Sequence, residues 1–371
     1  MAFLTIACPC LFGLESVLAS EIKRMGGQDV ETTDGRVTFK GPPRMVARAN
    51  ITLRTAERVL IVLGSFRAES FTELFDRVYA LPFESLIDKD DAFPVKGWAL
   101  NSKLMSVPDC QSIIKKAIAK RLGQIYGSAW LPETGPIHQV QFSVMRNIVT
   151  MMLDTSGTPL HKRGYRPEAN IAPIKETLAA GIADLARVKA DTLLIDPCCG
   201  SGTLLIESAM RALRVPPGLK RRFASESWSF LQAAEWQQER EDGFAGVLRD
   251  GHFRAIGGDL DPEFVELTQR NAARASVAQK IACSCADLAD FVPPDEPFVL
   301  ITNPPYGERM LEKEQAETLY RTMGKVFKPG EGRNYYVISP HEQFEKLFGR
   351  EASRRRKLYN GMIKCQLYMF F

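Results

Sequence analysis

The second half of the chain contains short apolar runs, each followed within two residues by glycine, proline or an acidic residue. Such runs lie at 193–195, 255–257 and 298–302. Each is short enough for a buried strand and too short for a buried helix. The residues after Thr203 and those around 265–275 instead show helical spacing of apolar positions. This alternation predicts an α/β fold with a mostly parallel sheet.

The two ends of the chain show other patterns. At the C-terminal end, residues 334–339 form an apolar run, and within 357–371 apolar and polar positions alternate with period two, which predicts a closing antiparallel pair of strands. Residues 1–60 are expected to form a small α/β unit, and the following region is of mixed α+β type. The helices predicted in this front part cover 13–25, 70–80 and 108–122, and its closing strands cover 140–144 and 149–154.

The composition is that of an ordinary folded protein. The chain has 371 residues, of which 45% are hydrophobic and 25% charged, which suits two or three domains. No run approaches the roughly 18 apolar residues of a membrane span, and the apolar opening up to Leu14 lacks the basic start of a signal peptide. The eight cysteines include no C-x-x-C pair. We therefore expect a cytoplasmic protein with reduced cysteines and no metal site.

The basic excess of the chain lies in its front part. Residues 1–167 hold 21 Lys and Arg against 16 Asp and Glu, whereas residues 168–371 hold 27 against 28. A basic amphipathic helix in this part could follow RNA phosphates as a set, although a plain solvated face is the better explanation for any one of its lysines. Its basic residues are Lys115, Lys116, Lys120 and Arg121.

The first candidate site is the segment Asp196-Pro-Cys-Cys-Gly-Ser-Gly-Thr203, which directly follows the run at 193–195. Ligands of open α/β sheets bind at this end of a strand. Gly200 and Gly202 allow a sharp turn and a close approach of the backbone to a ligand. No Lys follows the glycines, so the segment is not a phosphate loop, and its spacing is not that of the dinucleotide fingerprint. A ligand without a phosphate chain is favoured.

The second candidate site is Asn303-Pro-Pro-Tyr-Gly307, which follows the run at 298–302. The two prolines end the strand and stiffen the turn. The Asn303 side-chain carbonyl and a proline carbonyl could both accept from one exocyclic NH2 group, while Tyr306 offers a ring on which a base can stack. Such acceptors would favour the form of the amine in which the lone pair is exposed. The alternative is a turn that only ends the strand.

Two further strand ends carry an acidic residue. Asp259 follows the run at 255–257 and could accept from ribose hydroxyls. Asp287, beside Leu288, could accept from an adenine amine, although a solvated turn residue explains it equally well. Asp261 stands before Pro262 and Glu263, an arrangement typical of a helix N-cap, and is assigned a structural role.

Taken together, these motifs resemble those of class I S-adenosylmethionine-dependent methyltransferases that modify nucleobase amines. The segments His161-Lys-Arg-Gly-Tyr-Arg166 and Ala172-Pro-Ile-Lys-Glu-Thr-Leu-Ala179 also resemble the junction in bacterial THUMP-domain enzymes that methylate guanine N2 in 23S ribosomal RNA. The resemblance covers nearly the whole chain. Relatives can carry a second, fused methyltransferase domain that makes N7-methylguanine, which we expect to be absent from this chain.

The resemblance implies a Rossmann-like catalytic domain at 161–371 with a seven-stranded sheet, preceded by a ferredoxin-like part at 1–60 and an RNA-binding THUMP domain at 61–160. It also implies S-adenosylmethionine as cofactor and no membrane partner. The base-binding residues would be Asn303, Pro304, Pro305 and Tyr306. The cofactor-binding residues would be Lys175, Glu176, Thr177, Asp196, Cys199, Gly200, Gly202, Thr203, Asp259, Leu260, Asp287, Leu288 and Asn303.

Further basic residues are assigned to RNA. They lie in the junction, as Lys162, Arg163 and Arg166, and in a long insertion after the glycine loop, as Lys220, Arg221 and Arg222. The insertion also holds Trp228 and Trp236, which either lie beside bound RNA or form the core of an added helical subdomain.

The leading hypothesis is a methyltransferase acting on guanine N2 in 23S ribosomal RNA or its large-subunit precursor. Two alternatives stay open. One is another amino-methyltransferase, acting on adenine N6 in DNA or RNA or on a protein glutamine, because Asn-Pro-Pro-Tyr can hold an amine in either setting. The other is an RNA-binding assembly factor without catalytic activity.

Overall fold

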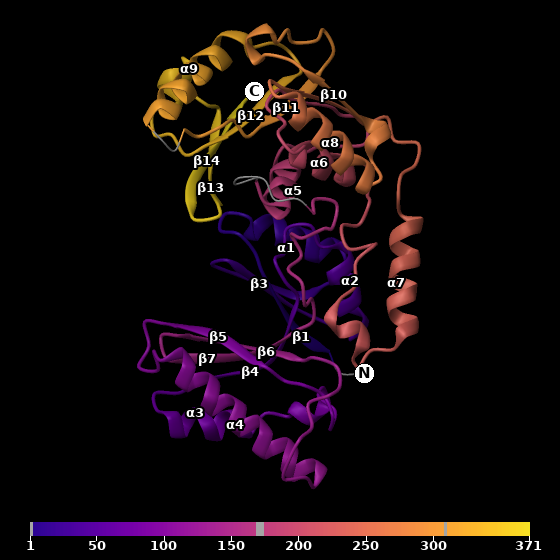
Figure 1. Ribbon diagram of the computed structural model, residues 1–371, viewed down its shortest axis with the longest axis vertical. Helices are drawn as coiled ribbons and strands as arrows, with labels where there is room; N and C mark the ends of the chain where they lie inside the picture. The colour runs from indigo at the N-terminus through magenta and orange to yellow at the C-terminus, as the bar shows by residue number, and fades with distance from the viewer. Residues whose placement is uncertain (1–2, 168–173, 308–309) are drawn as a thin grey trace. The chain divides into compact units, whose positions relative to one another are not determined.

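A computed structural model of the protein describes residues 3–167, 174–307 and 310–371. These residues form two compact units, each built around one seven-stranded sheet (Figure 1). The chain contributes to each unit more than once. The N-terminal unit consists of the residues up to Pro9, Ala19–Leu160 and Lys220–Asp242, and the C-terminal unit of Cys10–Leu18, His161–Leu219 and Gly243–Phe371.

The sheet of the N-terminal unit has the strand order β2-β3-β1-β4-β7-β6-β5. It continues through the expected domain boundary at residues 60 and 61, because β4 begins at Leu60 and pairs with both β1 and β7. The strands are β1 (Leu4–Pro9), β2 (Gln28–Thr33), β3 (Arg36–Gly41), β4 (Leu60–Arg67), β5 (Val95–Leu100), β6 (Gln139–Met145) and β7 (Ile148–Asp154).

The helices predicted in this part of the chain are present, each shifted by a few residues at most. The α-helices are α1 (Glu15–Arg24), α2 (Arg44–Thr52), α3 (Phe71–Tyr79) and α4 (Val107–Tyr126), with a 3₁₀ turn η1 (Phe83–Ser85).

The sheet of the C-terminal unit has the order β10-β9-β8-β11-β12-β14-β13. Strands β8 to β12 are parallel to their neighbours, whereas β14 is antiparallel to both β12 and β13. The predicted seven-stranded α/β sheet with a closing antiparallel pair is thus confirmed. Its strands are β8 (Leu193–Asp196), β9 (Arg254–Asp259), β10 (Ile281–Cys285), β11 (Phe298–Thr302), β12 (Arg333–Ser339), β13 (Arg354–Asn360) and β14 (Ile363–Phe370).

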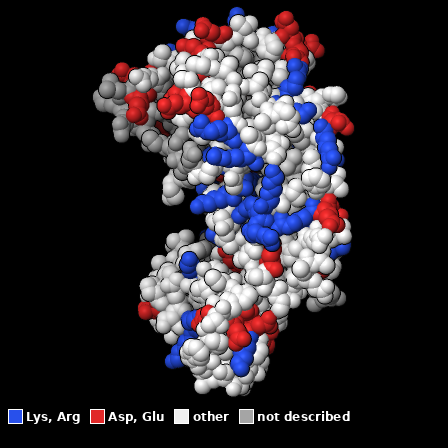
Figure 2. Space-filling view, turned by 45° about the vertical axis from the view of Figure 1, so that its right-hand side comes forward, with Lys and Arg blue, Asp and Glu red and all other residues white. Residues whose placement is uncertain are grey.

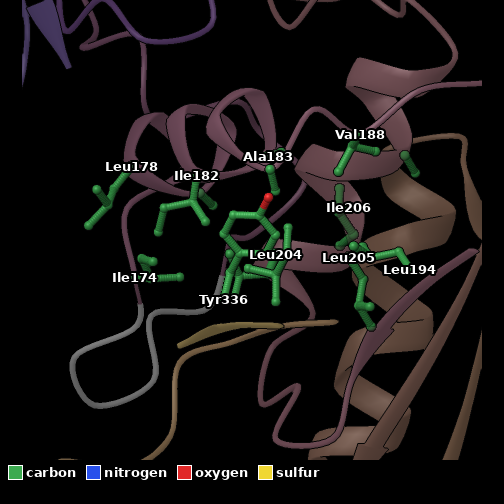
Figure 3. Packing of buried hydrophobic residues seen from close by; sticks show 14 of the residues in the cluster. Ile174, Leu178, Ile182, Ala183, Val188, Leu194, Leu204, Leu205, Ile206 and Tyr336 are labelled. Carbon is green, nitrogen blue, oxygen red and sulfur yellow. The ribbon is translucent and has the colours of Figure 1, made fainter. Parts of the chain in front are cut away.

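Helices cover both faces of this sheet, as βαβ connections require. Alternate residues of one strand therefore enter different cores: Leu194 packs with the helices α5 and α6, whereas Leu193 and Ile195 pack with α9 and α10. Figure 3 shows the first of these cores. The helices are α5 (Glu176–Leu185), α6 (Thr203–Ala212), α8 (Pro262–Arg274), α9 (Met310–Val326) and α10 (Phe344–Phe348), with 3₁₀ turns η3 (Ala278–Lys280) and η4 (Leu288–Asp290).

One early segment of the chain is part of the C-terminal unit. Leu14 and Val17 lie in the same buried cluster as α5 and α6. The backbone at Gly13 contacts β13: its carbonyl accepts from Arg356 Nε at 2.8 Å, and a Cβ atom at Gly13 would lie 2.3 Å from the Lys357 carbonyl oxygen. Residues 10–18 thus complete the core of the C-terminal unit.

The insertion after α6 contains the 3₁₀ turn η2 (Ala224–Ser227) and the helix α7 (Ala233–Ala245). Both tryptophans are buried, Trp228 at 2% exposure and Trp236 at 3%. Trp228 stacks on His138 with a centroid distance of 4.0 Å. Both tryptophans are therefore core residues and do not lie on an RNA-facing surface. The insertion up to Asp242 belongs to the N-terminal unit.

Candidate active site

The glycine segment links β8 to α6, and its conformation depends on both glycines. Gly200 and Gly202 have φ angles of 53° and 78°, which side chains disfavour. A Cβ atom on Gly202 would also lie 2.7 Å from Thr268 Cγ2, whereas one on Gly200 would meet nothing within 4 Å. Gly202 is therefore required for packing against α8, and Gly200 leaves open space on the ligand side of the loop.

Asp259 organises this loop through backbone amides. One of its carboxylate oxygens accepts from the Gly200 amide at 2.9 Å and the other from the Asp261 amide at 3.1 Å. A carboxylate has about four lone-pair sites, so it can still accept from ribose hydroxyls. Asp261 accepts from the Glu263 amide at 2.9 Å, and Pro262 begins α8. The predicted N-cap is thus confirmed.

Asp196 is the buried carboxyl group of the site. It is 1% exposed, and its side chain accepts from the Cys198 amide at 3.2 Å. Burial raises the pKa of Asp196 to about 7, and the nearby Asp259 carboxylate adds to this shift. The side chain therefore titrates near neutral pH, and a cationic ligand would favour its ionised form.

The third acidic strand end lies after β10. Asp287 is exposed and accepts from the Ala289 amide at 2.8 Å, which caps the short turn η4. Leu288 is buried in the core on the α9 side of the sheet. This cap agrees with a structural turn residue and leaves a carboxylate oxygen available to a ligand.

The Asn-Pro-Pro-Tyr turn follows β11 and is held by its own side chains. The Tyr306 hydroxyl donates to Asn303 Oδ1 at 2.6 Å, and Asn360 Nδ2 lies 3.4 Å from the same hydroxyl. The Pro305 carbonyl accepts from the Tyr320 hydroxyl at 3.3 Å. Pro304 therefore supplies the carbonyl best suited as a second acceptor for an amine. The Tyr306 ring is half-buried, and burial raises its pKa.

Both loops line one cavity of about 490 Å³. They meet there because β8 and β11 are neighbouring parallel strands whose carboxyl ends share one sheet edge. Among the residues that the structure describes, the lining contains no Lys, Arg or His. The predicted site residues in the lining are Asp196, Cys199, Gly200, Thr203, Asp259, Leu260, Asp287, Leu288, Asn303, Pro304, Pro305 and Tyr306.

This lining also includes residues that the sequence patterns did not single out. Phe264 and Leu319 add apolar surface, and Glu312 adds a carboxylate. Phe264 could have been found from its place in the first turn of the helix that follows Asp259. Glu312 and Leu319 come from α9, where nothing in the local sequence separates a cavity-lining residue from a solvated one.

Three of the predicted cofactor residues lie at the start of α5, outside the lining of this cavity. Lys175 is the N-cap, and Thr177 and Glu176 are buried. Glu176 pairs with Arg166 at 3.1 Å, and Arg166 Nη1 donates to Thr203 Oγ1 at 2.8 Å. Glu176 is thus linked through Arg166 to Thr203 at the end of the glycine loop.

Two of the residues predicted to contact RNA form ion pairs within the C-terminal unit. The Arg163 side chain is 2% exposed and its Nε lies 3.4 Å from a carboxylate oxygen of Glu207. The Arg166 side chain is 11% exposed. Both guanidinium groups are held inside the C-terminal unit by buried carboxylates, so neither presents a surface to RNA.

The other predicted RNA residues differ in their surroundings. Lys115 and Arg121 form ion pairs with Glu133 and Glu84, and the Arg221 guanidinium donates to the Thr158 and Leu160 carbonyls. Figure 2 shows a face of the molecule on which Lys and Arg side chains gather. Exposed basic side chains from the predicted set are Lys116, Lys120, Lys162, Lys220 and Arg222.

A wider hollow of about 920 Å³ lies at the amino end of β8, lined by residues 188–191 and 247–252 together with Arg211, Ala212 and Arg214. It contains none of the predicted site residues. The described part of the chain contains no group of three or more His, Cys, Asp or Glu side chains that could hold a metal ion. None of the helices in that part combines the length and the apolar character that a membrane span needs.

This sheet order, with the glycine loop and the Asn-Pro-Pro-Tyr turn at one edge, defines a class I methyltransferase. Models of three domains match the chain: an RMKL-like methyltransferase domain at residues 163–369, an RlmL ferredoxin-like domain at 5–60 and a THUMP domain at 68–154. The chain belongs to the RMKL-like methyltransferase family.

Individual relatives agree with this assignment. The chain is 38% identical to the "Putative RNA methyltransferase YpsC" of Bacillus subtilis (strain 168), over 99% of this chain and 96% of that protein. It is 33% identical to the "Ribosomal RNA large subunit methyltransferase K/L" of Psychromonas ingrahamii, over 97% of this chain but only 49% of that protein. A crystal structure titled "SMU.472, a putative methyltransferase complexed with SAH" matches with a TM-score of 0.95 and 37% identity, covering 100% of this chain and 98% of that one.

S-adenosylmethionine is therefore the cofactor. The described cavity fits it, because acidic side chains without basic ones suit a ligand that carries a sulfonium and an ammonium group. The space on the ligand side of Gly200 and the exposed carboxylate of Asp287 fit the same ligand.

Proposed function

We propose that this protein transfers a methyl group to the exocyclic N2 of a guanine in 23S ribosomal RNA. The observation that carries the proposal is the single cavity shared by the glycine loop and the Asn-Pro-Pro-Tyr turn. An RNA substrate is supported by the THUMP domain match and by the names of the two relatives, one of which is a large-subunit ribosomal RNA enzyme.

In this proposal the acidic strand ends hold the methyl donor. Asp196, Gly200 and Cys199 would border its methionine part, Asp259 its ribose, and Asp287 with Leu288 its adenine. The bound cofactor supplies an electrophilic methyl group on a positively charged sulfur. The carboxylates of the cavity would attract the cationic donor, and the residues of the glycine loop would orient its methyl group toward the acceptor turn.

The acceptor turn would prepare the amine. Asn303 Oδ1 and the Pro304 carbonyl would accept its two hydrogens, which favours the pyramidal nitrogen of the transition state. Asn303 Oδ1 now accepts from the Tyr306 hydroxyl, so the incoming amine takes the place of that hydroxyl as donor. The N2–methyl bond would form as the sulfur–methyl bond breaks, and the excess proton on the methylated N2 would pass to water. The base would enter the cavity after being flipped out of its stack.

The test is methyl transfer from labelled S-adenosylmethionine to 23S ribosomal RNA of a strain that lacks the enzyme, followed by nucleoside analysis. N2-methylguanosine is the expected product, and Asn303→Ala and Asp196→Ala should each abolish most of its formation. Asp295→Ala, an exposed carboxylate outside the cavity lining, is the matched control and should keep wild-type activity. If N6-methyladenosine is the product instead, the acceptor base is adenine and the proposed guanine acceptor is wrong. Absence of S-adenosylhomocysteine binding in calorimetry would instead favour an inactive assembly factor.

A further inference from the structure

The β13–β14 hairpin projects past the carboxyl edge of its sheet. Strand β14 pairs with β12 from Gln366 to Phe370, whereas Ile363 to Cys365 pair with β13 alone. Three strand residues span about 10 Å. The hairpin also reaches the acceptor turn, because Asn360 Nδ2 lies 3.4 Å from the Tyr306 hydroxyl. The face of the hairpin that carries Asn360 is therefore a neighbour of the site where the target base is proposed to bind. Lys357, Tyr359 and Lys364 lie on the other face of the same projecting hairpin.

The tip exposes apolar and aromatic side chains. Met362 in the two-residue turn is 96% exposed and Phe12 is 53% exposed. The Phe12 ring meets the Tyr359 ring edge-on, with a centroid distance of 5.9 Å. Single exposed hydrophobic residues are common, so the specific feature here is the pair of rings formed by Phe12 and Tyr359.

Two lysines flank these rings. Lys357 Nζ lies 5.3 Å from the centre of the Tyr359 ring, and Lys364 stands directly opposite Tyr359 in the strand register. Within the described parts of the chain, neither lysine lies within ion-pairing distance of a carboxylate. Arg355 and Arg356 on the same strand differ, because Arg355 pairs with Glu345 and Arg356 contacts Gly13 and Ser16. The charge of the two lysines remains available to an anionic partner.

We propose that Phe12, Lys357, Tyr359, Met362 and Lys364 form a surface, here called the hairpin platform, that binds the RNA nucleotides flanking the target base. The proposal rests on the proposed function, since it assigns the neighbours of the methylated nucleotide. A flipped base leaves neighbours whose stacking is incomplete, and aromatic or apolar side chains can replace the lost stack. The lysines would bind the adjacent phosphates.

The experiment measures KM for RNA with the full-length protein and labelled S-adenosylmethionine. Phe12→Ala and the double variant Lys357→Glu/Lys364→Glu should each raise KM for RNA about tenfold or more. Phe12→Trp should restore a KM near that of the wild type, because it keeps a ring for stacking. The double variant should also show a shallower salt dependence of RNA affinity, by about one unit of slope for each lysine. The control Lys346→Glu reverses the charge of a single exposed lysine of α10 and should leave KM unchanged.

Two further measurements separate platform binding from folding. The affinity for S-adenosylhomocysteine and the thermal midpoint should stay at wild-type values in all platform variants. Wild-type KM values for RNA in both Phe12→Ala and the double lysine variant would overturn the platform while leaving the proposed function standing. A wild-type enzyme that methylates no RNA would instead overturn the proposed function, and the platform with it.

Discussion

The glycine loop at 196–203, here called the donor loop, and the Asn-Pro-Pro-Tyr turn at 303–307, here called the acceptor turn, lie at the same sheet edge but are held in different ways. The donor loop is fixed by other elements: Asp259 binds the Gly200 amide, Thr268 donates to the Gly200 carbonyl and Asn271 donates to the Ser201 carbonyl. The acceptor turn is held partly by a hydrogen bond within itself, from Tyr306 to Asn303. In the proposed function, a donor can therefore enter a site that is already formed, whereas a base would have to replace an existing hydrogen bond.

The largest effect is expected for the acceptor turn. Asn303→Ala removes the side-chain carbonyl that would accept a hydrogen bond from the amine. It should lower the methyl transfer rate by on the order of a hundredfold or more, equivalent to a few kcal/mol in the barrier. Single-turnover kinetics with saturating RNA and donor measure this rate. The affinity for S-adenosylhomocysteine should change far less than the rate. Equal losses in both would mean that Asn303 acts mainly on the donor.

The next effect concerns Asp196 and pH. A cationic donor should bind the ionised form of Asp196, whose pKa is raised to about 7. Donor affinity should therefore fall as the pH drops below about 7, by at most tenfold per pH unit. Asp196→Asn should weaken donor binding at pH 8 and remove this pH dependence. Calorimetric titration between pH 6 and pH 8 measures both, with Asp295→Asn as control. A pH-independent affinity in the wild-type protein would contradict this role of Asp196.

The same carboxyl group should make the stability of the ligand-free protein fall as the pH rises, whereas donor affinity should rise with pH. A raised pKa in the folded state means that the stability contributed by the protonated form is complete below the unfolded pKa of about 4 and is lost as pH rises through about 7. Asp196→Asn should therefore stabilise the ligand-free protein at pH 8, by on the order of a few kcal/mol in the free energy of unfolding at most. The thermal midpoint should rise accordingly. At pH 4 the difference should be small. A lower midpoint for the variant at pH 8 would contradict this assignment.

The two loop glycines offer a matched pair of substitutions. Gly202→Ala places a Cβ atom 2.7 Å from Thr268 and should cost on the order of 1–3 kcal/mol of stability, because strain adds to the unfavourable φ angle. Gly200→Ala meets no neighbour and should cost about 1 kcal/mol or less in folding. Urea unfolding compares them. A Gly200→Ala variant that is the less stable of the two would contradict the assignment of Gly202 to packing.

The smallest effect is expected for Tyr306→Phe. This change removes the hydroxyl that occupies Asn303 Oδ1 but keeps the ring, so the rate should change by less than about tenfold. Tyr306→Ala removes the ring as well and should be much less active if the ring stacks on the base. Steady-state kinetics on the same RNA compare the pair. Equal activity of the two variants would exclude a stacking role.

Strand ends were predictable because they are marked locally. A short apolar run followed by Asp196, Asp259 or Asn303 identifies the carboxyl edge of a sheet without knowledge of its neighbours. The cap formed by Asp261 was predictable for the same reason, since Pro262 and Glu263 follow it directly. The shared cavity then follows from the parallel order of the strands.

Contacts between distant residues were not predictable in this way. Arg163 and Arg166 look like surface residues in sequence, because their partners Glu207 and Glu176 are identified only once the chain has folded. The four basic residues from Arg354 to Lys357 begin strand β13. An edge strand can carry exposed charges on one face while Leu358 packs into the core.

The place of Leu14 has a practical consequence for anyone who dissects this protein. Its side chain lies against α5, where a Cβ atom on Gly181 would meet it at 2.6 Å. A fragment that starts at residue 161 would leave a hole in its own interior where Leu14 and Val17 belong. We expect such a fragment to be recovered only together with the first eighteen residues, supplied either in the same polypeptide or as an added peptide.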